Sequence, residues 1–355
     1  MVYCVLYMST RSWITLITLA LLGAVIYFGR HELLKAWGLM GQVDLWVLAI
    51  MVPVQIASYY AVGAASFSYL RKKGNLDHMS QLGMTRLSLE LNFVNHILPS
   101  GGLAGFSYWA WILKHHGVSG ARATMSQVVR FLLTFVGFAV MALVAFVVLL
   151  LNGSMDRMIG IITIGLIVFL LGLMLGGQFL IKNRQRLERF SQWLAAVSNG
   201  FVRIVTFGRK RQSVQAANLH NFFMEFHDDY EEIMQDRKIL WGPFLWTLLA
   251  NACDVALLFV AFWALGIVVD PAILVVAFGV SSVVSIVSVT PGGTGVYEAV
   301  MIAVLAAGGV GQSQAIAGTL LARVTLLLGT IIFGYVFYQM SIVKYGKSTG
   351  QRPTR

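Results

Sequence analysis

Apolar stretches about as long as a membrane is thick are the feature that most restricts the fold of this 355-residue chain. A helix needs about 20 consecutive apolar residues to cross roughly 30 Å of bilayer hydrocarbon. Short alternating strands, typical of a membrane β-barrel, are not visible. We therefore expect an all-α polytopic integral membrane protein, a single transmembrane domain over residues 1–355 with about six full spans. These spans are predicted at residues 12–29, 44–70, 121–151, 158–181, 240–266 and 312–340.

The composition supports this class and excludes others. Hydrophobic residues make up 58% of the chain and charged residues 12%, whereas a soluble domain carries about 25% charged residues, so a soluble enzyme is excluded. The net charge of +11 would suggest nucleic acid in a soluble protein. In a membrane protein, basic residues accumulate in cytoplasmic loops, so we expect no nucleic-acid partner. Cys4 and Cys253 match no disulfide framework or metal site, and we expect no metal and no cofactor.

Two further apolar stretches are interrupted near their middle. Residues 84–114 contain the break Leu98-Pro99-Ser100-Gly101-Gly102, and residues 272–308 contain Thr290-Pro291-Gly292-Gly293-Thr294-Gly295. Most pieces beside these breaks are too short to cross the bilayer. Non-helical backbone at that depth is tolerated only where protein or water covers it. Both stretches are therefore predicted to be broken helices or re-entrant hairpins that line a cavity.

The distribution of basic residues predicts the orientation. With the N-terminus inside and six alternating spans, the first broken stretch enters from the cytoplasm and the second from the outside. All but five of the 26 lysines and arginines then lie on the cytoplasmic side, as the positive-inside rule requires. The exceptions are Arg30, Lys35 and Arg157 outside, and Arg130 and Arg323 within the membrane. We expect a multi-pass protein of the cytoplasmic membrane with both termini in the cytoplasm.

The two broken stretches resemble each other and indicate an inverted repeat. In each, a glycine break precedes a short helix with a tyrosine, then a Gly-Val pair and a long helix with one arginine. The tyrosines are Tyr108 and Tyr297, and the arginines are Arg130 and Arg323. Paired interrupted segments in two halves indicate a transporter binding site near the membrane midplane.

The glycine breaks are candidate anion-binding loops. A helix that begins after such a break presents free backbone N–H groups and the positive end of its dipole, which favour an anion such as phosphate. The alternative is a simple turn that reverses the chain. The glycines that would contact a head-group phosphate are Gly101, Gly102, Gly292, Gly293 and Gly295.

Arg130 and Arg323 are the second set of candidates, because each lies inside an apolar helix. A buried arginine normally faces a partner or a water-filled cavity, and a guanidinium suits bidentate binding of phosphate. The alternative is a structural ion pair with Glu90, Asp254 or Glu298, the three acids placed in the membrane. Phosphate binding and a structural ion pair are compatible, because an ion pair that opens would act as a gate.

The same three carboxylates are candidates for proton coupling. Glu298 lies in the first turn of the helix after the second break, where the helix dipole would stabilise it or where it would cap the helix. Asp254 shares one face of its span with Asn251, and Glu90 lies just before the first break.

Residues 182–239 form a polar insertion between two spans. It begins basic and ends acidic, and Phe222, Phe223, Phe226 and Tyr230 recur at helical spacing. This pattern predicts a cytoplasmic helical hairpin on the membrane surface. The alternative is a solvated connector that closes the bundle. Residues 341–355 form a basic cytoplasmic tail, and the basic face would contact anionic lipid head groups.

Two signatures resemble a known family. They are residues 92–130 with the first break and residues 290–323 with Pro291-Gly292-Gly293-Thr294-Gly295-Val296-Tyr297-Glu298. They are similar to the flippase-like membrane domain of lysylphosphatidylglycerol synthases/flippases, over roughly residues 12–340. The resemblance implies a polytopic domain that moves an amphipathic lipid between leaflets. Ser100 stands where family members often have glycine, which weakens the expectation that the first loop cradles phosphate.

Two-domain members of that family also carry a C-terminal cytosolic domain that aminoacylates phosphatidylglycerol. This chain ends at Arg355, soon after its last span, so we expect no synthase activity.

The function expected is that of a lipid translocase, with no catalytic residues. Its cargo would be a phospholipid or a polyprenyl-phosphate-linked lipid whose head group lies between the two breaks, near Arg130 and Arg323. One alternative is a membrane-embedded transferase with Glu298 or Asp254 as base. Another is a scaffold that recruits a lipid-modifying enzyme through residues 182–239. The sequence leaves the oligomeric state open.

Overall fold

The computed structural model describes residues 41–345 except 42, 98–102, 154–155, 187, 190–191, 194–215 and 288–292. Within these residues the chain is helical and contains no strand. The helices are α2 Leu45–Ala49, α3 Met51–Lys72, α4 Gln81–Ile97, α5 Leu103–Lys114, α6 Gly120–Leu151, α7 Arg157–Ile181, α9 Ala216–Gln235, the 3-10 helix η3 Arg237–Leu240, α10 Trp241–Ala264, α11 Pro271–Val287, α12 Val296–Ala307 and α13 Gln312–Tyr345.

Five helical segments of the described chain are long and apolar enough to cross a membrane. They are Leu45–Lys72, Gly120–Leu151, Arg157–Phe179, Arg237–Ala264 and Gln312–Tyr345. They confirm five of the predicted spans and the prediction of an all-α multi-pass membrane protein. The remaining predicted span, 12–29, lies outside the described residues.

Short polar side chains mark where the helices begin. Ser119 accepts a hydrogen bond from the N–H of Arg122 at the start of α6, and Asp156 accepts one from Met158 at the start of α7. Asp270 does the same for Ala272 at the start of α11. These side chains satisfy N–H groups that have no partner inside the helix, so each helix begins at a defined residue.

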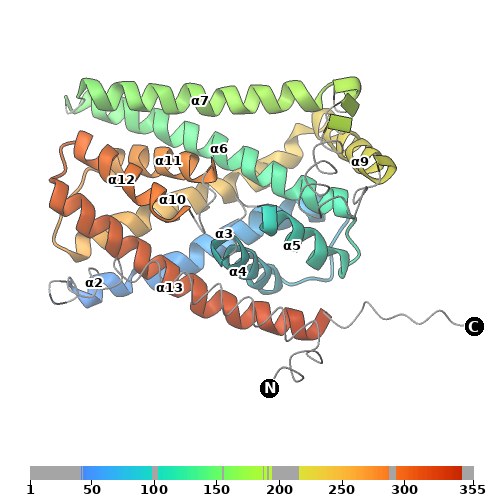
Figure 1. Cartoon of the computed structure of the whole chain (residues 1–355), viewed down its shortest axis with the longest axis horizontal. Helices are drawn as coiled ribbons and strands as arrows, with labels where there is room; N and C mark the ends of the chain where they lie inside the picture. Colours follow the sequence, from blue (N-terminus) through green and yellow to red (C-terminus); the bar gives the residue numbers. More distant parts are fainter. Residues whose placement is uncertain are drawn as a thin grey trace, which may run out of the picture.

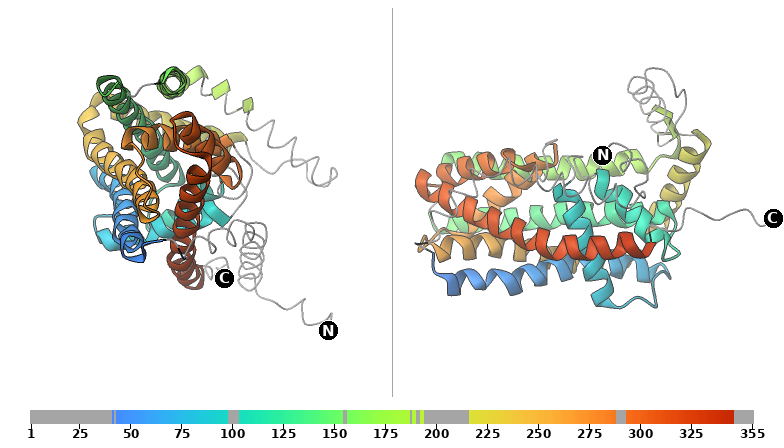
Figure 2. Two further views of the ribbon diagram at one scale, coloured as in Figure 1. Left: turned by 90° about the vertical axis from the view of Figure 1, so that its left-hand side faces the viewer. Right: turned by 60° about the horizontal axis from the view of Figure 1, so that its bottom comes forward.

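The outer surface of the bundle is apolar where a bilayer would contact it. Helix α7 lies at the periphery (Figure 2, left) and exposes large aliphatic and aromatic side chains along its length. Lipid tails are as apolar as these side chains, so exposing them has no hydrophobic cost in a membrane. Polar side chains are therefore concentrated inside the bundle and at its ends.

Both predicted breaks separate two shorter helices. Helices α4 and α5 flank the first, and α11 and α12 flank the second. The α4–α5 hairpin lies toward the end of the bundle that carries α9, and the α11–α12 hairpin lies toward the opposite end (Figure 1). The two hairpins therefore enter the bundle from opposite ends, as predicted for an inverted repeat.

The helix contacts show the same repeat. The first half is α3–α4–α5–α6 and the second is α10–α11–α12–α13. Within each half the short helix after the break packs on the long one, α5 on α6 and α12 on α13. Between the halves, α4 packs on α13, α11 packs on α6, and α3 packs extensively on α10. Each of these contacts thus has a counterpart in the other half or joins equivalent helices, whereas the packing of α10 on α6 has no equally extensive counterpart between α3 and α13.

Two side-chain amides at equivalent positions of the two halves form equivalent hydrogen bonds. Gln55 of α3 donates from Nε2 to the carbonyl of Leu326 in α13, at 3.1 Å. Asn251 of α10 donates from Nδ2 to the carbonyl of Thr134 in α6, also at 3.1 Å. Each amide therefore anchors the long helix of the opposite half.

The axis that relates the two halves passes between α3 and α10. Ser58 and Asp254 follow Gln55 and Asn251 by three residues each. The Ser58 hydroxyl donates to Asp254 Oδ1 at 2.7 Å. Two equivalent residues contact each other directly only beside a two-fold axis, so this hydrogen bond marks where the halves meet.

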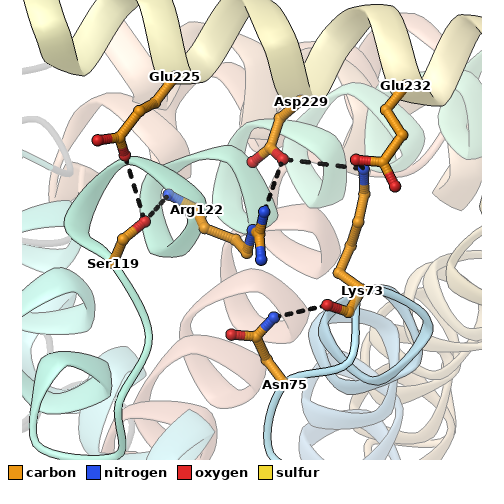
Figure 3. Close-up of polar contacts among 7 residues, drawn as sticks. All are labelled: Lys73, Asn75, Ser119, Arg122, Glu225, Asp229 and Glu232. Carbon is orange, nitrogen blue, oxygen red and sulfur yellow. Dashed lines mark hydrogen bonds and ion pairs between the residues drawn. The ribbon is translucent and has the colours of Figure 1, made fainter.

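Helix α9, from the polar insertion, lies across one end of the bundle (Figure 2, right) and is tied to it by ion pairs (Figure 3). Lys73, after α3, lies 2.5 Å from Glu232 and 3.8 Å from Asp229. Arg122 of α6 lies 3.5 Å from Asp229. Burial raises the pKa of Asp229 above its ordinary value, and the two cations oppose that rise.

The apolar face of α9 packs on the bundle. Phe226 and Ile233 are buried in the same core as Met125 of α6 and Ile181 of α7. His227 Nδ1 lies 2.9 Å from the carbonyl of Ile181. Helix α9 therefore links the ends of α3, α6 and α7.

A substitution at Gly334 tests the contact between the two halves. Here α13 crosses α4 so closely that a Cβ would lie 2.5 Å from Phe93 Cβ and 2.9 Å from the Leu89 carbonyl. We expect Gly334→Ala to destabilise the detergent-solubilised protein by about 1–3 kcal/mol, measured as a lower melting temperature. Gly172→Ala in α7, where a Cβ meets nothing within 4 Å, is the matched control. It should be neutral or stabilising by up to about 1 kcal/mol. Equal effects of the two variants would contradict the close packing.

Candidate functional site

A cavity of about 260 Å³ lies inside the bundle, where the two halves meet. Helices α3, α4, α10, α11, α12 and α13 all contribute to it. Its lining includes residues near the ends of the helices that flank the breaks, such as His96 of α4, Ser285 of α11 and Tyr297 of α12. The polar lining residues are Ser58, Tyr59, Asn92, His96, Asp254, Ser282, Ser285, Tyr297, Arg323 and Thr330.

Arg323 is the cation of this cavity. Its Nε lies 2.8 Å from Glu298 Oε1, and the two side chains are 11% and 5% exposed. The guanidinium lies over the Tyr297 ring, 4.9 Å from its centroid. The ion pair that the sequence left open as an alternative is therefore present, and its arginine lines the cavity.

Glu298 also caps α12, the helix that follows the second break. Its Oε2 accepts a hydrogen bond from the Gly295 N–H at 2.6 Å. Gly295 has φ +88°, a conformation that only glycine adopts readily. The break, the helix start and the ion pair are thus one connected arrangement, because Glu298 contacts Gly295 through one oxygen and Arg323 through the other.

The other glycines of the breaks are described only in part. Gly293 has φ +71°, and a Cβ on it would lie 2.7 Å from Ser285 Cβ in α11. Glycine at this position therefore allows the loop to pass close to α11 beside the cavity. The candidate residues Gly101, Gly102 and Gly292 lie outside the described residues.

Arg130 is not a structural copy of Arg323. Its Nε and Nη2 donate to Gln127 Oε1 at 3.1 and 2.8 Å, and its guanidinium lies 4.6 Å from the Phe131 ring centroid. It attracts Asp254 of α10 electrostatically but is not part of the cavity lining. The cavity is thus asymmetric, because Arg323 lines it and Arg130 does not.

Glu90 belongs to a separate polar cluster. Its Oε1 accepts from Arg86 Nε and from Ser341 Oγ, each at 2.9 Å, and its Oε2 accepts from the Tyr108 hydroxyl at 2.5 Å. These bonds tie α4 to α5 and α13. Glu90, one of the three proposed partners for the membrane arginines, therefore pairs with Arg86 instead.

The family of the chain follows from comparison with family models. The model described as the lysylphosphatidylglycerol synthase TM region matches residues 12–334. The chain belongs to this family. No curated protein and no solved structure shows a significant match. Membership in the lysylphosphatidylglycerol synthase TM family indicates a role connected with membrane lipids.

In this family member, sequence reasoning missed the contribution of α3 to the cavity. Gln55 donates to the Tyr59 hydroxyl at 2.8 Å, and that hydroxyl is hydrogen-bonded to Thr330 of α13. The available signal was the polar pattern Gln55-x-x-Ser58-Tyr59 in an otherwise apolar span. Its spacing of three matches Asn251-x-x-Asp254 in α10, and that correspondence would have indicated a polar interior contact.

A double-mutant cycle tests the Arg323–Glu298 pair. Glu298→Gln removes the negative charge that faces a nearly buried guanidinium, so we expect a loss of about 3 kcal/mol in unfolding free energy. Combining it with Arg323→Gln should cost less than the sum of the single variants by more than about 1 kcal/mol. Glu231→Gln is the control, because its pair with His227 is 61% exposed on the glutamate side and should contribute at most about 1 kcal/mol. Additive effects of Glu298→Gln and Arg323→Gln would contradict the coupling.

Proposed function

We propose that the protein is a lipid translocase that moves a phosphate-bearing lipid between the leaflets of the cytoplasmic membrane. The observation that carries this proposal is Arg323 in the wall of a polar cavity where both broken hairpins end. Buried arginines in membrane proteins mark substrate pathways, and inverted repeats with broken helices hold their substrate at this place.

The chemistry of the cavity supports a phosphate head group. A guanidinium presents two parallel N–H groups that match two phosphate oxygens. Tyr59, Asn92 and the serines of α11 offer neutral hydrogen-bonding groups around it. The volume of about 260 Å³ is at the lower limit for small-molecule sites, about 300 Å³. It suits a head group and not acyl chains, so the tails would remain in the bilayer.

The arrangement of the halves supports movement of that head group. The two hairpins lie toward opposite ends of the bundle (Figure 1), and α4 of the first and α11 and α12 of the second line the cavity. Rocking one half against the other would open the cavity alternately toward each leaflet. A phosphate that binds Arg323 competes with Glu298 for the same N–H groups. The ion pair would thus close the empty site and open when the lipid binds.

The charge distribution supports a cytoplasmic location for the α9 end. Lys73, Arg122, Lys182 and Lys344 all lie at or beside helix ends on this side of the bundle (Figure 1). Basic residues accumulate on the cytoplasmic side, and anionic head groups there would bind them.

Two other functions make different predictions. A membrane-embedded transferase with Glu298 or Asp254 as base would form a product when given lipid and a donor. A scaffold would keep its function without Arg323 and lose it when α9 is detached from the bundle. Glu298 has its two oxygens on Arg323 and Gly295, which suits a gate better than a free base.

Reconstitution into liposomes tests the proposal. We expect wild type to move fluorescent phosphatidylglycerol at least about tenfold faster than empty liposomes, and Arg323→Ala to lose at least about tenfold of that rate. Arg323→Lys keeps the charge but not the bidentate geometry and should lie between them. Arg157→Ala removes an exposed arginine at the other end of the bundle and should behave as wild type. A wild-type rate equal to that of empty liposomes, for phospholipids and polyprenyl-phosphate lipids alike, would refute the proposal.

A further inference from the structure

The ionisable groups around the cavity are balanced in charge. Arg323 lies against Glu298 at 2.8 Å, and Arg130 attracts Asp254 across the contact between α6 and α10. Arg323 and Asp254 line the cavity, Glu298 and Arg130 are their respective partners, and the four formal charges cancel. Such neutrality is expected in a bundle interior, because an uncompensated buried charge is costly.

An anionic lipid disturbs this balance. The head group of phosphatidylglycerol brings a net charge of minus one into the cavity, whereas the zwitterionic head group of phosphatidylethanolamine brings no net charge. Arg130 and Arg323 do not neutralise this added negative charge, since the charge of each is already balanced by a carboxylate. Binding of one proton by one of the two carboxylates would restore neutrality.

Asp254 is the carboxylate that suits this role. Glu298 suits it less, because its Oε2 accepts the Gly295 N–H at 2.6 Å in the first turn of α12, where the positive end of the helix dipole favours a negative charge even when the phosphate occupies Arg323. Asp254 accepts one hydrogen bond from the neutral Ser58 hydroxyl. A protonated Asp254 keeps this bond, because its second oxygen carries the proton.

The other titratable groups facing this region do not compete for the proton. A cationic His96 on α4 would be repelled by Arg323. Tyr59 on α3, Tyr297 on α12 and Cys253 on α10 itself are neutral acids near neutral pH and take up no proton there. Helix α11 contributes serines to the cavity, which do not titrate.

We propose that Asp254 binds one proton from solution whenever an anionic lipid occupies the cavity, so that anionic lipid and proton move together. This inference rests on the proposed translocase function. The proton forms an O–H bond at one Asp254 oxygen when the phosphate enters and returns to water when it leaves. A zwitterionic lipid crosses without it.

The experiment compares fluorescent phosphatidylglycerol and phosphatidylethanolamine in proteoliposomes over about three pH units around neutrality. At pH values where Asp254 is deprotonated, the wild-type rate for phosphatidylglycerol should fall about tenfold for each further pH unit, because one proton is bound per lipid. The rate for phosphatidylethanolamine should not change. Asp254→Asn resembles the protonated acid, so it should move phosphatidylglycerol at a rate independent of pH.

Two further variants complete the test. Asp228→Asn makes the same change at an exposed position of α9 and should keep the wild-type pH profile. Ser58→Ala removes the hydroxyl that stabilises the Asp254 carboxylate and should move the midpoint of the wild-type profile to higher pH. If melting curves show that Asp254→Asn does not fold, the Ser58→Ala shift decides the outcome.

The outcomes separate the two proposals. A phosphatidylglycerol profile that is flat in wild type, or equally steep in Asp254→Asn, overturns the proton step and leaves the translocase. So does an unshifted profile in a folded Ser58→Ala. Equal pH slopes for both lipids also overturn it. If wild type moves neither lipid faster than empty liposomes, the translocase fails and the proton step fails with it.

Discussion

Arg323 and Glu298 lie 2.8 Å apart inside a bundle whose outer surface is apolar. Removing two charges from water costs several kcal/mol each, so both need further polar partners. Glu298 obtains one because the chain breaks before α12 and leaves the Gly295 N–H at the helix start. The broken helix, the conformation of Gly295 and the buried ion pair therefore depend on one another.

The contact between α3 and α10 joins the two halves of the bundle around this ion pair. Equivalent amides, Gln55 and Asn251, each hold the long helix of the opposite half, and Ser58 meets Asp254 beside the axis. A symmetric frame alone would give two equal sites. The side chains remove that equality, because Arg130 binds Gln127 of its own helix while Arg323 faces the cavity. The two similar halves therefore differ in the polar residues that they present to the cavity.

Helix α9 connects this interior to the end of the bundle. Its carboxylates bind Lys73, at the end of α3, and Arg122, at the start of α6 (Figure 3). The α4–α5 hairpin runs between these two points, so α9 holds the end of the hairpin whose inner end borders the cavity.

The sequence by itself determined five spans, the two breaks, the repeat and the placement of Arg130 and Arg323 inside apolar helices. These follow from the length of apolar runs, from glycine and proline, and from the cost of charge in an apolar helix, all of which are local properties. It left three acids as partners for two arginines. Only the tertiary structure assigned Glu298 to Arg323 and placed Asp254 beside Ser58. The pair of Glu90 with Arg86, four residues apart on α4, is a local pattern that the sequence already contained. The pairs that join different helices depend on how those helices cross, so no local pattern contains them. Ser58 and Asp254 are 196 residues apart in the chain, and packing of α3 on α10 alone brings them to 2.7 Å.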